Sequence, residues 1–325
     1  MHFSAYAALC ILLSASAQAT PPVKPAKSGC GKKHAPGFND DVDKHSIKSG
    51  GRTRTYAVNV PESYNDDPTK EWPLIIDYHG NKGTPAKQYN NSMYYKYPEG
   101  QGYLAVYPAG VQKHWEGPSY AVEGVSDLQF TTDLLAHLRE NYCIDSNRIY
   151  ASGKSNGGGF VDTLACSDHG DEFAAFAMAA AALYTDVDEK AVCPKRRAIL
   201  EEHGEKDKTI PYHPEEPGSG GPLPDIMKWV KRWAKRDGCD PKKDRRVSGD
   251  EGGYEVTSYS CKGLEDVVTH YRVFELGHCW SDSDGENTDS KRDYCQDHSL
   301  DFTPVVLDFF SKWTLDTAPK NPGGL

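Results

Sequence analysis

The stretch from Ile149 to Phe160, with the sequence IYASGKSNGGGF, constrains the fold more than any other part of the chain. In it a β-prone run meets Gly-x-Ser-x-Gly, and an apolar segment with helical spacing follows. At so sharp a strand-to-helix turn, side chains two positions before and after the serine would collide, and Gly153 and Gly157 remove them. We expect the turn to place the hydroxyl of Ser155 at the tip of a strand, with the first helical N–H groups pointing at the bound substrate.

Predicted strands alternate with amphipathic helices along the whole chain. We expect strands at 54–60, 72–78, 103–108, before Ser155, from about 176, at 197–203 and at 267–275. Helices are expected to begin at a capping box that opens with Ser126, to run over 224–236, and to begin again at Thr303. This alternation predicts an α/β fold: one mostly parallel sheet with helices on both faces. No internal repeat or Pro/Ser-rich linker divides the chain, so residues 20–325 are expected to form one domain.

Residues 1–19 have the pattern of a secretory signal peptide. An apolar stretch of about ten residues precedes Ala17-Gln18-Ala19, a small-x-small cleavage site. Its removal takes Cys10 away and leaves eight cysteines, and an even number in an exported chain predicts disulfide bonds, up to four of them. The chain is therefore expected to be secreted and stabilised by disulfides.

The cysteine pattern leaves most pairings open. Cys239 and Cys261 bound a segment expected to leave the main sheet, and they are expected to pair. Cys279 has two possible partners, Cys30 and Cys295. No Cys or His spacing suits zinc, and the acidic run 282–289 has its glycine at the wrong position for a calcium loop, which favours a solvated loop. We expect no metal and no other cofactor.

Charge and sequence motifs limit the possible partners. The chain has 325 residues and a formal net charge of -10, and its basic residues form no run that would contact a phosphate backbone. Nucleic acid and membrane surfaces are therefore not expected partners, and no later segment is apolar enough to span a membrane. The sequon at Asn90 is consistent with a glycosylated surface loop. We expect an extracellular monomer.

Three residues have the order that nucleophilic catalysis by serine requires. A serine hydroxyl needs a general base within hydrogen-bond reach, and an acid that orients the base. Beyond a strand-to-helix serine these follow in the order acid, then histidine, each after a later strand. Asp207 follows the strand 197–203, and His278 follows the strand 267–275. Glu205 is the nearest alternative acid.

Other polar residues near the strand ends have simpler interpretations. His79 and His203 each precede a glycine, and we interpret them as side chains that pack the bases of their loops. An oxyanion needs two N–H donors. The backbone N–H groups of Asn156, directly after the nucleophile, and of Asn81, after the His79-Gly80 strand end, are the candidates.

A family resemblance covers about residues 28–315. The run from Cys143 to Gly158, with Tyr78-His79-Gly80, His203-Gly204-x-x-Asp207 and Gly277-His278-Cys279-Trp280, resembles the secreted fungal feruloyl esterases of types C and D. These esterases lie in the carbohydrate-esterase and polyhydroxybutyrate-depolymerase-like branch of the α/β-hydrolases. The resemblance implies a single-domain α/β-hydrolase fold, the triad Ser155, Asp207 and His278, and oxyanion donors at Asn81 and Asn156.

The resemblance also implies a substrate class. It predicts a serine carboxylesterase that releases ferulic and related hydroxycinnamic acids from feruloylated plant cell-wall polysaccharide, xylan or pectin. Aromatic candidates for the walls of the acyl site are Trp115, Tyr212 and Trp280, with core or loop packing as the alternative for each.

Related functions remain as alternatives to a feruloyl esterase. Acetylxylan esterases and polyester depolymerases share the serine motif and the His-Gly strand, although a polymer-binding module is not found here. A catalytically silent hydrolase-like module that binds carbohydrate belongs to a different class, but no triad residue is missing. A peptidase is disfavoured because no propeller or cap sequence is found.

Overall fold

The computed structural model describes residues 28–249, 252–296 and 298–321. The signal-peptide prediction for residues 1–19, with Cys10, lies outside this range. Within it, eleven strands form the sheet: β1 (Gly37–Asn39), β2 (Ser46–Ser49), β3 (Arg52–Val60), β4 (Trp72–Tyr78), β5 (Leu104–Pro108), β6 (Ile144–Lys154), β7 (Ala175–Ala179), β8 (Ala198–Gly204), β9 (Arg245–Ser248), β10 (Tyr254–Cys261) and β11 (Leu264–Val273). The helices are α1 (Pro85–Ser92), α2 (Asp127–Asn141), α3 (Asn156–Ala165), α4 (Ile226–Asp237) and α5 (Phe302–Ser311).

The centre of the sheet is parallel and its edges are antiparallel. The strand order is β1-β3-β5-β4-β6-β7-β8-β11-β10-β9, and β2 pairs with β3 outside this path. From β5 to β11 every neighbouring pair is parallel, so the carboxyl ends of β4, β6, β8 and β11 share one edge of the sheet. The predicted mostly parallel sheet is confirmed.

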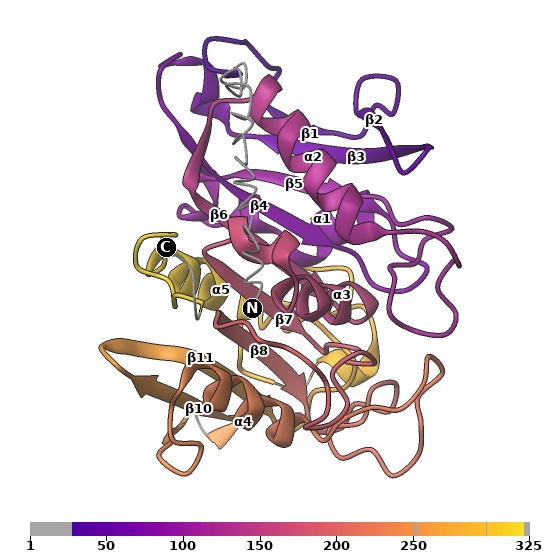
Figure 1. Ribbon diagram of the computed structural model, residues 1–325, viewed down its shortest axis with the longest axis vertical. Helices are drawn as coiled ribbons and strands as arrows, with labels where there is room; N and C mark the ends of the chain where they lie inside the picture. Colours follow the sequence, from indigo (N-terminus) through magenta and orange to yellow (C-terminus); the bar gives the residue numbers. More distant parts are fainter. Residues whose placement is uncertain (1–27, 250–251, 297, 322–325) are drawn as a thin grey trace, which may run out of the picture.

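Helices cover both faces of the sheet, because successive side chains of a buried strand point to opposite sides. In β4, Tyr78 is hydrogen-bonded to Thr131 of α2 and packs on Phe160 of α3, whereas Asp77 beside it accepts from Gln88 of α1. Figure 1 shows α2 and α3 in front of the sheet.

The helices α4 and α5 also lie on opposite faces of the sheet. Tyr150 of β6 stacks on Phe310 of α5, so α5 lies on the face of α1. Trp229 and Trp233 of α4 both donate to Asp162 of α3, so α4 lies on the face of α3. Strand residues such as Leu74, Ile149 and Leu200, in the middle of this arrangement, are fully buried.

Of two predicted helix N-caps, one is confirmed and the other is wrong. The side chain of Ser126 caps α2 by accepting from the backbone N–H of Gln129 at 3.2 Å, as predicted. The prediction that Thr303 caps the last helix is wrong, because the residue at the N-cap of α5 is Asp301, two positions earlier. The hydroxyl of Thr303 is used elsewhere: it donates to the backbone oxygen of Ser92 and accepts from Trp280.

The segment 239–261 extends the sheet instead of leaving it. It contains β9 and β10, which pair antiparallel beyond β11. Four disulfides join the eight described cysteines: Cys30–Cys143, Cys166–Cys193, Cys239–Cys261 and Cys279–Cys295. The predicted pairing of Cys239 is confirmed, and the structure selects Cys295 as the partner of Cys279.

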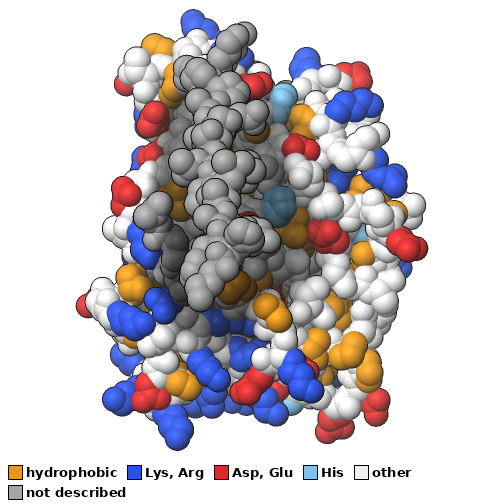
Figure 2. Space-filling view, in the orientation of Figure 1, with side chains coloured by type: hydrophobic (Ala, Val, Ile, Leu, Met, Phe, Trp, Pro, Cys, Tyr) orange, Lys and Arg blue, Asp and Glu red, His pale blue; other side chains and the backbone are white. Residues whose placement is uncertain are grey.

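Surface charge is distributed unevenly. Figure 2 shows Lys and Arg side chains gathered at the lower end of the visible face, where Figure 1 places α4. Two arginines of α4, Arg232 and Arg236, are paired with Asp186. Among the described helices, none has the length and hydropathy needed to cross a bilayer.

Candidate active site

Ser155 occupies the strained turn that the sequence predicts. It lies between β6 and α3 with φ 56° and ψ -119°, a left-handed conformation that costs a non-glycine residue energy and that persists only where the surroundings impose it. A Cβ on Gly153 would lie 2.7 Å from the backbone of Gly157, and a Cβ on Gly157 would lie 2.1 Å from the carbonyl oxygen of Tyr78. The close approach of strand, turn and helix therefore requires both glycines.

The three candidate triad residues meet at the carboxyl edge of the sheet. The Oγ of Ser155 lies 2.8 Å from Nε2 of His278, and Nδ1 of His278 lies 2.6 Å from Oδ2 of Asp207. The other carboxylate oxygen of Asp207 accepts the backbone N–H groups of Thr209 and Ile210, which fixes its orientation. Glu205, the alternative acid, instead pairs with Arg272 at the surface.

The charges around His278 keep it available as a base. Burial and the nearby ammonium of Lys154 hold the pKa of His278 below its usual value, against the raising effect of Asp207. Burial alone would raise the pKa of Asp207, but the hydrogen bond from His278 and the electrostatic effect of the two neighbouring histidines, His278 and His203, hold that pKa below the ordinary value. At neutral pH the histidine is therefore neutral and the aspartate is ionised, as proton removal from Ser155 requires.

The two predicted oxyanion donors, Asn156 and Asn81, belong to segments that adjoin Ser155. Asn156 is the first residue of α3, so its N–H has no partner within the helix. Its side chain is held in two hydrogen bonds with the backbone of Trp115. The loop that carries Asn81 closes over the nucleophile: a Cβ on Gly80 would lie 3.3 Å from the Cβ of Ser155. Asn156 is therefore placed directly after the serine with its N–H outside the helical hydrogen-bond pattern, and the donor role of Asn81, next to Gly80, stays a prediction.

His79 holds the base of that loop. Its Nδ1 donates to the carbonyl oxygen of Gly80 and its Nε2 accepts the N–H of Gly110, which requires the neutral ring. Burial accordingly lowers the pKa of His79 to about 4. The interpretation of this histidine as a packing residue is confirmed.

His203 does more than pack its loop. Its Nε2 lies 3.5 Å from Oδ2 of Asp207, while its Nδ1 lies 2.9 Å from Glu201, which is fully buried. Burial alone would lower the pKa of His203, but the charge and hydrogen bond of Glu201 raise it to about 9. A positive charge therefore lies behind Asp207. The second oxygen of Glu201 is 2.7 Å from His270, so one buried carboxylate serves two histidines. Sequence reasoning missed Glu201, although its position two residues before His203 in a strand predicts that the two share a face.

The acidic run 282–289 is the expected solvated loop only in its middle, because residues 283–286 are exposed whereas the two ends of the run are buried. Asp282, Asn287 and Asp289 are buried, and Asp282 accepts backbone N–H groups of its own turn. Asp289 lies beside the candidate triad: Lys154, the residue before Ser155, is 2.9 Å away, and the N–H of Trp280 donates to the same oxygen at 3.0 Å.

The three aromatic candidates for an acyl site are packing residues. Trp115, Tyr212 and Trp280 have at most 1% of their surface exposed, so their rings present nothing to a ligand. Trp115 donates to the carbonyl oxygen of His79, Tyr212 bonds His270, and Trp280 donates to Thr303. The prediction that they line the acyl site is wrong because each polar edge is satisfied inside the core.

A different aromatic residue lies beside the base. A cavity of about 390 Å³ is lined by His278, Thr209 and Tyr294, among others, and Tyr294 is half exposed. The N–H of Gly277 donates to the carbonyl oxygen of Tyr294, and the disulfide Cys279–Cys295 joins the same two segments. The sequence signal that could have found Tyr294 is its position before Cys295, which can pair with Cys279, the neighbour of His278.

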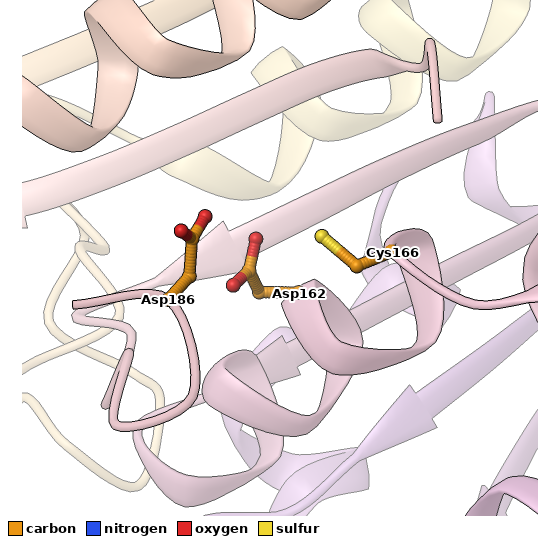
Figure 3. A group of neighbouring side chains, drawn as sticks. All are labelled: Asp162, Cys166 and Asp186. Atoms are coloured by element: carbon orange, nitrogen blue, oxygen red, sulfur yellow. The ribbon is translucent and has the colours of Figure 1, made fainter. Parts of the chain in front are cut away.

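A second group of polar side chains lies away from this edge and does not form a metal site. Asp162, Cys166 and Asp186 converge between α3 and the loop that follows β7 (Figure 3). The sulfur of Cys166 is used in its disulfide with Cys193, and Asp186 is paired with arginines. One oxygen of Asp162 accepts from two tryptophans. Of these donor atoms, only the second oxygen of Asp162 has no hydrogen-bond partner among the described residues, and one free oxygen is too few for a cation, so these residues do not fit a metal.

Comparison with known proteins finds distant homologues of the chain. No family model matches the chain. It is 28% identical over 222 residues to feruloyl esterase B of Piromyces equi, a match that covers 65% of this chain and 40% of that protein. It is 26% identical to feruloyl esterase D of Neurospora crassa over 88% of this chain and 90% of that protein. The chain is a distant homologue of fungal feruloyl esterases and of an acetylxylan esterase.

Solved structures identify the fold. The acetyl xylan esterase from Aspergillus awamori superposes with a TM-score of 0.54 at 16% identity, over 72% of this chain and 93% of that one. The chain therefore has the α/β-hydrolase fold. The segment compared with the Piromyces enzyme spans less than half the length of that relative.

Proposed function

We propose that the protein is a serine carboxylesterase that works through an acyl-enzyme. The observation that carries the proposal is the continuous chain of hydrogen bonds from Ser155 through His278 to Asp207, at 2.8 and 2.6 Å. No cofactor takes part in this chemistry, because nucleophile, base and oxyanion donors all come from the protein. The distant homology to esterases supports the same reaction class.

In this mechanism His278 takes the proton of Ser155 as Oγ attacks the ester carbonyl carbon. The negative charge on the carbonyl oxygen is stabilised by the N–H groups of Asn81 and Asn156. The imidazolium that forms is stabilised by Asp207, and it gives its proton to the departing alkoxide as the acyl-enzyme forms. A water molecule, deprotonated by His278, then attacks the acyl carbon and releases the carboxylic acid with Ser155 restored.

The substrate class proposed is a hydroxycinnamoyl ester, feruloyl above all, of plant cell-wall polysaccharide. The relatives named feruloyl esterases support it, and so does the half-exposed ring of Tyr294 in the cavity beside His278, against which an aromatic acyl group could stack. We further propose that residues 20–325 act as one secreted domain after loss of residues 1–19, with a glycan at Asn90, because four disulfides suit an oxidising compartment.

Ser155→Ala tests the reaction itself. Because the nucleophile is lost, hydrolysis of 4-nitrophenyl acetate and methyl ferulate should fall by a factor on the order of 10⁶. Full activity of this variant would refute the mechanism. Circular dichroism of the variant provides the control for folding.

The acyl preference has its own test, because the homology also includes an acetylxylan esterase. Values of kcat/KM for methyl ferulate, 4-nitrophenyl acetate and acetylated xylan, measured side by side, separate the two functions. Activity confined to acetyl esters would overturn the feruloyl assignment and favour the acetylxylan esterase.

A further inference from the structure

A recess of about 110 Å³ lies beside the loop that carries Asn81. Its walls come from this loop, from the first turns of α1, from the end of β6 and from the segment around residues 288–292. The charged and oxyanion residues that line it are Asn81, Lys82, Lys87, Lys154, Asp289 and Arg292. Four cationic side chains thus face one carboxylate, in a chain whose net charge is -10.

The one carboxylate is already fully engaged. Asp289 lies 2.9 Å from Lys154 and 3.2 Å from Arg292, and it also accepts from Asn91 and from the N–H of Trp280. It therefore has no capacity left to neutralise Lys82 or Lys87. Neither lysine has an acidic partner within 4.0 Å among the described residues. The recess keeps two uncompensated positive charges at its mouth.

Neither lysine is placed for the stability of the fold. Lys87 lies in the first turn of α1, where the helix dipole favours acidic side chains and disfavours a cation. Lys82 has φ 60°, a left-handed conformation that costs a lysine energy, and its N–H is fixed to the carbonyl oxygen of Lys113. Backbone strain of this kind, close to a reactive group, is expected where a side chain must be presented to a ligand.

The recess is next to the reacting atoms. Asn81, whose N–H is a proposed oxyanion donor, lines it, and so does Gly80, whose Cβ position is 3.3 Å from the Cβ of Ser155. Lys154 precedes the nucleophile directly. A group bound in the recess would therefore lie close enough to the ester under attack to be part of the same molecule.

We infer that this recess is a subsite for a carboxylate of the substrate, and that the sugar chain bearing the ester carries a uronic acid close to it. The inference rests on the proposed esterase function and adds the class of polysaccharide: acidic instead of neutral. The volume accommodates a carboxylate with part of its ring, and Lys82 and Lys87 supply the charge that the engaged Asp289 cannot cancel.

Binding to the Ser155→Ala protein tests the subsite without requiring turnover. Isothermal calorimetry with a uronic-acid oligosaccharide and with a neutral xylo-oligosaccharide of equal length should show about tenfold tighter binding of the acidic ligand at low salt. This preference should shrink as salt is added. Equal affinity for the two ligands would overturn the inference.

Substitutions locate the effect. In the Ser155→Ala background, the double variant Lys82→Gln with Lys87→Gln should lose the preference for the acidic ligand, about tenfold. Lys291→Gln is the matched control, because Lys291 is exposed in the same segment but does not line the recess, and it should keep the preference. A preference that survives in the double variant, or is lost equally in the control, would refute the assignment.

Two further arms separate the possible failures. If inorganic phosphate displaces the acidic oligosaccharide as well as free uronate does, the recess is a general anion site and the carboxylate assignment is wrong. Hydrolysis of 4-nitrophenyl acetate by the wild-type enzyme is measured in parallel. If the wild-type protein lacks this activity, the proposed esterase function is refuted. If it is an active esterase but does not prefer the acidic oligosaccharide, only the subsite is refuted.

Discussion

Two buried carboxyl groups, Asp207 and Asp162, show how differently one fold treats the same side chain. Both are almost completely removed from solvent, and burial by itself raises the pKa of each. Asp207 lies against His278 and the charged His203, and its pKa falls below the ordinary value. Asp162 receives two indole N–H groups, has the carboxylate Asp186 as its neighbour, and its pKa rises to about 7.

The difference lies in the partners, since the burial is similar. One oxygen of Asp162 has no hydrogen-bond partner within the described part of the chain, whereas both oxygens of Asp207 are engaged. Where hydrogen bonds and positive charge offset the cost of burying the carboxylate, as at Asp207, the group keeps a fixed negative charge that can stabilise an imidazolium. Uncompensated burial produces a carboxyl group that holds its proton. Each region also has its own disulfide, so the two can be perturbed in parallel.

Between the two regions, the largest loss of activity is expected from a change at Asp207. Asp207→Asn keeps the shape of the side chain but removes the charge and favours the wrong tautomer of His278, so kcat for methyl ferulate should fall on the order of 10⁴-fold. The thermal midpoint is measured in the same samples. Glu205→Asn, in the same loop, is the control and should retain activity because Glu205 faces Arg272 at the surface. A modest decrease in kcat for the Asp207 variant would show that another acid orients the histidine.

The two disulfides should separate activity from stability. Cys279→Ser with Cys295→Ser frees the loop next to His278, and we expect about a 30-fold loss of kcat/KM together with about 3 kcal/mol of stability. Cys166→Ser with Cys193→Ser should cost similar stability but leave activity nearly intact at a temperature where the protein is folded. Equal loss of activity in both variants would mean that disulfides act on the whole fold and not on the catalytic histidine.

The charge behind Asp207 is expected to contribute less. Glu201→Gln removes the carboxylate that keeps His203 protonated, so the positive charge near the Asp207–His278 pair is lost. We expect about a tenfold fall in kcat/KM, and the acid limb of its pH profile should move to higher pH because His278 becomes easier to protonate. In the wild type that limb should lie below the ordinary histidine value. A fall in activity without movement of the limb would indicate a purely structural role for Glu201.

The smallest effect concerns Asp162 and appears only as a pH dependence of stability. Its folded pKa is raised, so its contribution to stability is complete below its unfolded value near 4 and is lost as pH rises towards about 7. Asp162→Asn should therefore flatten the decline in unfolding free energy between about pH 5 and pH 8, by about 1–3 kcal/mol. Urea unfolding at the two pH values measures it. Asp186→Asn should instead lower the unfolding free energy at both pH values, because it leaves Arg232 and Arg236 unpaired. If the unfolding free energies of the wild type and of Asp162→Asn had the same pH dependence, the explanation would be contradicted.

Sequence reasoning worked best where local geometry leaves few choices. The turn at Ser155 could be predicted because only glycine tolerates the approach at Gly153 and Gly157. The order and spacing of Asp207 and His278 predicted the positions at which the structure places these two residues. The central strands followed from their apolar runs, which both faces of the sheet bury.

What the sequence could not indicate depends on contacts between distant segments. The partner of Cys279, the burial of Asp289 and the inward direction of Trp280 are decided by residues far away along the chain. The strands β1 and β2 are only three and four residues long, and α1 buries polar side chains, Gln88, Asn91 and Ser92, so tertiary packing holds these elements in place. Composition shows that aromatic residues are plentiful, but not that Tyr294 is the one beside His278.

Asp289 has a consequence for the engineering of this scaffold. One carboxylate joins Lys154 next to the nucleophile, the N–H of Trp280 after the base, and Asn91 at the end of the helix that follows the oxyanion loop. The end of a strand, a helix and a loop therefore share a single anchor point. A graft that exchanges any one of these three segments between enzymes, to alter which acid is released, has to carry the matching contact to Asp289 with it. Otherwise the other two segments lose their alignment at the same time.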